Sequence, residues 1–249
     1  MANQYKNSPL IEVLLSIHVT PLQAESLSKL RGIQEFIKKD YPEFKIKTEF
    51  KASFNVQQTH TDVTPETSGN PIGYIFSSSN LQKMIQATLS GYTFNILQPY
   101  NDWDSFKKEA AVGWNVYAKQ SNLLQISRIE LRYINKITID TNFAPIDFKE
   151  YILTTPEIAP ALPQSMSDFF MSLVVPGMDQ NVAIITQTVD RSKEVSKNML
   201  PLLFDIAVFR DTSLQSDSLE IWNIADSLHT YALDIFNKSL TDKTKQLFT

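Results

Sequence analysis

Ile126-Ser-Arg-Ile-Glu-Leu-Arg-Tyr-Ile-Asn-Lys-Ile-Thr-Ile-Asp140 carries the clearest strand pattern in the sequence. Apolar and polar residues alternate along most of it; the apolar positions are Ile129, Leu131, Tyr133, Ile137 and Ile139, and the polar ones are Arg128, Glu130, Arg132, Lys136 and Thr138. Successive side chains of a strand point to opposite faces, so the pattern predicts a long strand in a sheet with one dry and one wet face. Asn135 interrupts the apolar positions. We expect this amide either to be held by structural hydrogen bonds or to belong to a site.

The rest of the chain predicts further strands interleaved with helices. A strand is expected over Leu10 to Val19, followed by a helix from Thr20-Pro21 to about Lys39, with Thr20 as its N-cap. A helix beginning at Asn101 or Asp102 carries an aromatic stripe that favours packing on a sheet. We expect Asp217 and Glu220 to cap the last helix. The other predicted strands cover residues 45–56, 73–78, 83–89, 92–97, 169–175, 182–189 and 200–209.

Each half of the chain thus reads as strand, helix, several strands and helix. Ile11-Glu12 aligns with Ile129-Glu130, and Phe94-Asn-Ile96 aligns with Phe204-Asp-Ile206, but the repeated order of elements is the stronger evidence. We therefore predict an α+β fold in which two related β-α-β(3-4)-α halves form one curved, mainly antiparallel sheet with helices on one face. The halves would cover residues 1–125 and 126–249 and share one core. The TATA-binding-protein fold and helix-grip ligand cups have this outline, which does not fix a function.

Composition excludes several classes of function. The chain has 249 residues, a hydrophobic fraction of 43%, a net charge of −4 and no cysteine. Disulfides, thiolate catalysis and cysteine-based metal sites are therefore excluded, and a dominant attraction to nucleic acid or to an anionic membrane is not expected. No signal peptide and no apolar run of about 20 residues is visible, so we expect a cytoplasmic protein without membrane association.

Motifs that bind cofactors or metals are not found in the sequence. The three histidines lie in separate regions, and none has a second histidine at metal-ligand spacing. The sequence contains neither a G-x-G-x-x-G nor a G-x-x-x-x-G-K-[ST] phosphate loop, and no G-x-S-x-G elbow. We predict no cofactor and no metal.

Three stretches together carry a family resemblance: Asn7-Ser-Pro-Leu-Ile-Glu12, Phe94-Asn-Ile-Leu-Gln-Pro-Tyr-Asn-Asp-Trp103 and Leu131-Arg-Tyr-Ile-Asn135. They resemble a sporadically distributed prokaryotic family of unknown function, marked by P-L-I-E, F-N-R-L-x-P-Y and R-Y-I-N motifs in this order. The resemblance covers nearly the full chain and implies no activity. Ile96 stands where that family often has arginine, so an anion-binding role at this position is not carried over.

Six residues are candidates for a ligand site: Glu12, Asn95, Tyr100, Glu130, Arg132 and Asn135. Two carboxylates of this set, Glu12 and Glu130, occupy equivalent places on the first strands of the two halves. Paired carboxylates can do acid–base work, whereas cross-strand pairing with arginine would only stabilise the sheet. The other four residues could line a polar pocket on the shared sheet. Alternatively, Tyr100 serves to anchor the following helix.

These features favour a non-enzymatic binding or accessory protein that recognises a protein partner or a small ligand on the open face of the sheet. A metal-independent hydrolase or transferase that uses Glu12, Glu130, Arg128 and Arg132 is the alternative. Nucleic-acid binding on a saddle-shaped sheet is a third, which the acidic composition disfavours. A homo-oligomer is compatible with all three.

Overall fold

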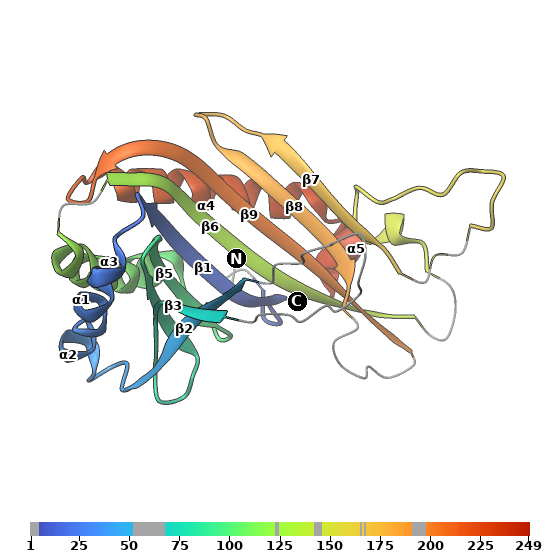
Figure 1. Cartoon of the computed structure of the whole chain (residues 1–249). Helices are drawn as coiled ribbons and strands as arrows, with labels where there is room; N and C mark the ends of the chain where they lie inside the picture. Colours follow the sequence, from blue (N-terminus) through green and yellow to red (C-terminus); the bar gives the residue numbers. More distant parts are fainter. Residues whose placement is uncertain are drawn as a thin grey trace, which may run out of the picture.

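The computed structural model describes residues 5–51, 68–122, 125–141, 146–164, 166, 168–190 and 198–249 (Figure 1). The first part of the chain contains β1 (Leu10–Val19), η2 (Ala24–Ser26), α1 (Leu27–Arg31), α2 (Gln34–Ile37), β2 (Glu43–Lys51), β3 (Ser68–Ser77), β4 (Lys83–Thr88), β5 (Gly91–Leu97) and α3 (Trp103–Ser121). The second part contains β6 (Gln125–Asp140), η3 (Phe148–Glu150), β7 (Phe170–Pro176), β8 (Val182–Val189), β9 (Met199–Gln215), α4 (Glu220–Ser239) and α5 (Asp242–Gln246).

One nine-stranded sheet in the order β2-β3-β4-β5-β1-β6-β9-β8-β7 dominates the structure. Every strand pairing in it is antiparallel. The predicted α+β class with a mainly antiparallel sheet is therefore confirmed. The strands of residues 1–125 and those of residues 126–249 meet where β1 lies beside β6, with Leu15 opposite Leu131.

The helices pack on the face of the sheet that the alternation marks as dry. Phe94 of β5 contacts Phe106 of α3, and Phe204 of β9 contacts Phe236 of α4. Figure 1 shows α4 running along β6 and β9. Leu15, on the same face, is fully buried. We call this the helix side, and we call the opposite face, which carries the polar alternate residues of β1 and β6, the open face.

The predicted helix from Thr20 to Lys39 is wrong in its extent. The chain instead forms the short η2, α1 and α2, and the first of these begins only at Ala24. Gly32 ends α1, and its backbone N–H bonds the carbonyl of Ser28. Leu30 and Ile37 are buried on both sides of this break, so apolar spacing alone could not reveal it.

The predicted helix caps are confirmed for α3 but not for α4. Asp102 caps α3 as expected, because its Oδ1 accepts the backbone N–H of Ser105 at 2.8 Å. The predicted pair of Asp217 and Glu220 does not form; the Ser218 hydroxyl accepts the Glu220 N–H at 3.2 Å instead. The predicted strand 45–56 is confirmed as far as Lys51, and residues 52–56 of this prediction lie outside the described residues. Within the described ranges, no helix is both long and apolar enough to cross a bilayer.

Candidate functional site

A hydrogen-bonded pair between β1 and β5 lies near the middle of the open face. Asn95 donates its side-chain N–H to Oε1 of Glu12 at 2.8 Å. The Asn95 side chain is only 1% exposed, and no described residue is a hydrogen-bond partner of its buried carbonyl oxygen. Burial raises the pKa of Glu12, although the bond from Asn95 and the nearby charge of Arg132 act in the opposite direction. The pair therefore combines a half-buried carboxylate of raised pKa with an amide oxygen that no described residue bonds.

An ion pair on the next two strands adjoins this pair. Arg132 of β6 donates to Asp205 of β9 from Nε, at 2.9 Å to Oδ1, and from a terminal nitrogen to Oδ2. The Arg132 side chain is 43% exposed and that of Asp205 is 16% exposed. The guanidinium of Arg132 therefore faces solvent while the more deeply buried carboxylate of Asp205 holds it in place. Its charge is also one of the causes that lower the pKa of Glu12.

Further along the same strands lies a second charged group. The Nε2 atom of His18 is 3.8 Å from Oε2 of Glu130, which is too long for a hydrogen bond. The pKa of Glu130 is lowered, first by His18 and also by the two neighbouring arginines. Arg128 pairs with Asp211 at 2.6 Å and lies over the ring of Phe209 at 3.9 Å from its centroid.

Negative charge exceeds positive charge in this open-face centre, which we define as Glu12, His18, Asn95, Arg128, Glu130, Arg132, Asp205 and Asp211. Its four carboxylates and two guanidinium groups leave two excess negative charges when histidine is counted as neutral. The four acids are only partly compensated by bonds within the centre. The chemistry that such a surface accepts is a cationic or hydrogen-bond-donating group.

The structure places the predicted site residues on two sides of the sheet. Glu12, Asn95, Glu130 and Arg132 share the open face, as the register of β1, β5 and β6 requires. Tyr100 and Asn135 are buried on the helix side instead. The expected pocket lined jointly by Asn95, Tyr100, Arg132 and Asn135 is therefore not formed, because the sheet separates its members.

Asn135 is held by the backbone of its own sheet. The side chain is fully buried and donates an N–H to the carbonyl of Phe204, on the neighbouring strand β9, at 3.1 Å. On its other side, β1 is irregular between Leu10 and Glu12, where the register with β6 shifts. Asn135 thus lies beside this register shift, and its buried amide oxygen has no hydrogen-bond partner among the described residues.

A cluster that the sequence did not single out joins α3 and α4 on the helix side. Trp103 stacks on His229 with ring centroids 4.4 Å apart and donates its indole N–H to Asp226 at 2.6 Å. Lys107 pairs with the same carboxylate at 2.7 Å. The hydroxyl of Tyr133 lies 2.6 Å from Nδ1 of His229. We call these five residues the helix clamp.

Electrostatics explain how the helix clamp holds together. Burial lowers the pKa of His229 to about 4, so the imidazole is neutral at pH 7. Its Nδ1 can then accept a hydrogen bond from the Tyr133 hydroxyl. Tyr100 packs edge-on against Tyr133 at 6.4 Å, and burial raises the pKa of both phenols. Only the aromatic stripe of α3, including Trp103, was visible in the sequence; the pairing with His229 required the tertiary structure.

The two candidate catalytic carboxylates do not converge. Glu12 lies opposite Ile134, whereas Glu130 lies opposite Ser16, four positions further along β1. At about 3.3 Å per residue this separation is roughly 13 Å along the strand. Their pKa values shift in opposite directions, as an acid and a base require, but no single substrate atom lies within reach of both.

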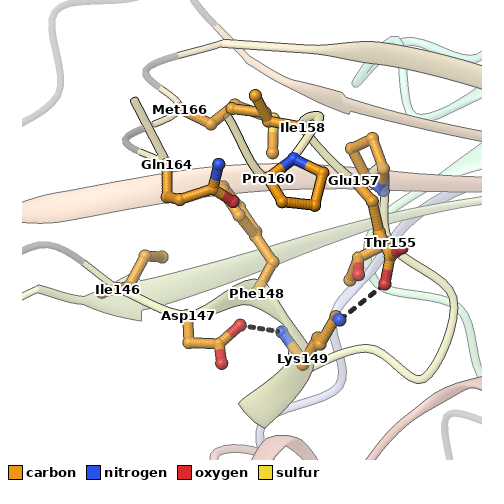
Figure 2. A pocket seen from close by; sticks show the side chains of 11 residues that line it. Ile146, Asp147, Phe148, Lys149, Thr155, Glu157, Ile158, Pro160, Gln164 and Met166 are labelled. Carbon is orange, nitrogen blue, oxygen red and sulfur yellow. Dashed lines mark hydrogen bonds and ion pairs between the residues drawn. The ribbon is translucent and has the colours of Figure 1, made fainter. Parts of the chain in front are cut away.

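A pocket separate from the open-face centre lies beside the loop that follows η3 (Figure 2). Its volume is about 960 Å³, and its walls include Phe148, Glu157 and Gln164. Lys149 crosses its edge to pair with Glu157 at 2.7 Å. None of the predicted site residues lines it. In the part of the chain that is described, no group of three or more histidine or acidic residues could hold a metal ion.

Comparison with known proteins adds no relative, since no family model matches the chain and no curated protein matches it.

Proposed function

We propose that this protein is a non-enzymatic binding protein whose open-face centre receives a cationic, hydrogen-bond-donating group from a partner protein or a small ligand. The observation that carries the proposal is the Glu12–Asn95 pair. A half-buried carboxylate with a raised pKa lies beside an amide oxygen that has no partner in the described part of the chain. A bound cation that donates hydrogen bonds would lower the energy of the carboxylate. It could also satisfy that oxygen if the Asn95 side chain moves.

The proposal includes an internal duplication and membership of the family that the motifs resemble. The mirrored strand order supports the duplication: β5 lies beside β1 as β9 lies beside β6. The sequence alignment places Asn95 opposite Asp205. Asn95 of β5 bonds Glu12 of β1, and in the same way Asp205 of β9 bonds Arg132 of β6. In this arrangement the binding centre would lie at the seam of the two halves.

The chemistry of the ligand can be tested with defined probes of opposite charge. We would measure fluorescence anisotropy with a labelled peptide of alternating arginine and glycine, with an equally long glutamate–glycine peptide, and with spermidine as a competitor. The expected result is saturable binding of the basic peptide that weakens as salt is raised. No saturable binding of either cation, or preference for the acidic peptide, would contradict the proposed chemistry.

Two matched variants localise the effect. Glu12→Gln removes the charge from the centre and should weaken the basic peptide about tenfold, because hydrogen bonds to charged groups are worth about 1.5–3 kcal/mol. Glu157→Gln makes the same chemical change on the loop outside the open face, where the side chain is 73% exposed, and should change affinity less than twofold. Equal losses in both variants would indicate nonspecific attraction.

The enzymatic alternative draws on one observation, the opposite pKa shifts of Glu12 and Glu130. Their separation along the strands weighs against a shared reaction centre. Nucleic-acid binding is supported still less, because a phosphate backbone requires a positive surface and the open-face centre has excess negative charge.

A further inference from the structure

Strand β7 forms one end of the sheet and exposes apolar side chains on both of its faces. Phe170 and Val174, which point to the open face, are 73% and 68% exposed, and Val175 on the helix side is 36% exposed. In Figure 1, β7 is the outermost strand beyond β8. Among the described residues, no strand pairs with its outer edge. Such an edge is a template for pairing with another chain.

The two edges of the sheet differ in the way that distinguishes a protected edge from an available one. Strand β2, at the other end, carries charged side chains that discourage pairing, among them Glu43, Lys45 and Lys47. Strand β7 reads Phe-Met-Ser-Leu-Val-Val-Pro and carries no charge. Two copies of β7 can therefore approach each other without bringing like charges together.

The backbone direction of β7 follows from the turn that ends it. Gly177 donates its N–H to the carbonyl of Asn181, on the β8 side, at 2.7 Å. Backbone groups alternate between the two sides of an antiparallel strand, so Val175, Leu173 and Met171 also face β8. Phe170, Ser172 and Val174 consequently direct their N–H and C=O groups outward, where a second strand can bond them.

We propose that β7 pairs with β7 of a second copy of this chain, antiparallel and about a two-fold axis at Ser172. In this register Phe170 lies opposite Val174 of the other copy, and Ser172 lies opposite itself. The three outward residues exchange six backbone hydrogen bonds across the axis. Each aromatic ring then meets a β-branched side chain, a favourable cross-strand pair. Pro176, which has no N–H to donate, falls outside the paired core.

The two-fold pairing has a consequence for the whole molecule. An axis normal to the sheet keeps both open faces on the same side, so the dimer would have one continuous sheet of 18 strands, twice the nine of one copy. The strand is only seven residues long. The buried area should therefore be near the lower limit of about 1,000 Å² for a specific interface. A dissociation constant in the micromolar range is expected. This inference does not depend on the proposed ligand.

Sedimentation velocity from about 1 to 100 μM tests the association. The expected result is a reversible monomer–dimer equilibrium that Val174→Glu abolishes. The matched control is Ile46→Glu on the other edge strand, at a side chain that is 59% exposed, and it should leave the dimer intact. Circular dichroism melts establish that both variants are folded. A wild-type monomer at every concentration, or polymers that grow without limit, would overturn the proposal.

Cross-linking tests the register, and the absence of native cysteine makes every introduced thiol unique. Ser172→Cys should form a covalent dimer under mild oxidation, since directly opposed residues have Cα atoms about 5.5 Å apart, within disulfide range. Val174→Cys, on the same face of the same strand, should not, because its copies lie four positions apart. Rapid cross-linking of Val174→Cys in place of Ser172→Cys would contradict the register.

Discussion

The helix clamp and the open-face centre use similar side chains on opposite sides of the same strand, β6, in different ways. On the helix side, Tyr133 meets an imidazole that is neutral, and the indole of Trp103 donates to a carboxylate that Lys107 already balances. On the open face, Arg132 remains 43% exposed and Glu12 keeps a raised pKa. The helix clamp therefore fastens helices to the sheet, whereas the open-face centre leaves charge accessible.

The largest expected effect is on the helix clamp. Trp103→Ala removes the stack on His229 and the hydrogen bond to Asp226, and should lower the free energy of unfolding by about 3 kcal/mol. Trp103→Phe keeps a ring and should recover about half of the loss. Urea denaturation measures both. A loss below about 1 kcal/mol for the alanine variant would mean that the clamp does not stabilise the fold.

The second largest effect is expected on the pH dependence of stability, which His229 of the helix clamp should dominate. The pKa of His229 is about 4 when folded, against about 6.5 when unfolded. Between these values the unfolded chain binds more protons, so stability should fall as pH decreases from about 6.5 to 4. The partly exposed imidazole should contribute about 2 kcal/mol over this window. His229→Phe should remove that contribution. Urea midpoints at pH 7, 5.5 and 4 supply the measurement, and equal slopes in both proteins would refute the assignment.

Glu12→Gln, unlike the substitutions in the helix clamp, should not lower the stability of the fold at pH 7. The folded-state pKa of Glu12 is raised, so the charged form is disfavoured by folding at neutral pH. Neutral glutamine keeps an oxygen for Asn95 and should leave the free energy of unfolding at pH 7 unchanged or raise it by less than about 1 kcal/mol. Thermal and urea unfolding decide this. Destabilisation by more than about 2 kcal/mol would show that the carboxylate is structural.

The smallest effect is expected at the rim of the open face. The Asp211 side chain is 68% exposed, and its pair with Arg128 is screened by solvent. Asp211→Asn should therefore change the free energy of unfolding by less than about 0.5 kcal/mol. Calorimetry or urea denaturation provides the check. A loss above about 1.5 kcal/mol would show that this pair stabilises the fold more than a solvent-screened ion pair does.

The alternation along Ile126–Asp140 was enough to predict the central strand and its two faces, because a two-residue repeat of apolar and polar side chains can be read from the sequence alone. The same pattern placed Glu130 and Arg132 on the wet face, and the alternation along Leu10–Val19 did so for Glu12. Asn135 follows the alternation onto the dry face, but the pattern left its role open. Tyr100 could not be assigned to a side, since a residue after a strand no longer follows the alternation. The partnership of Trp103 with His229 joins residues distant in sequence, and no local pattern encodes it.

The side-chain amide resonances of Asn95 report on the proposed binding of a cation by the Glu12–Asn95 pair. Heteronuclear NMR of ¹⁵N-labelled protein titrated with the arginine–glycine peptide should show saturable shifts of these resonances and of the Glu12 and Arg132 backbone amides. The helix clamp should stay unchanged, and Glu12→Gln should move the midpoint of the titration to an about tenfold higher peptide concentration. Shifts that spread over the whole molecule, or an unaffected Asn95 amide at saturation, would contradict the claim.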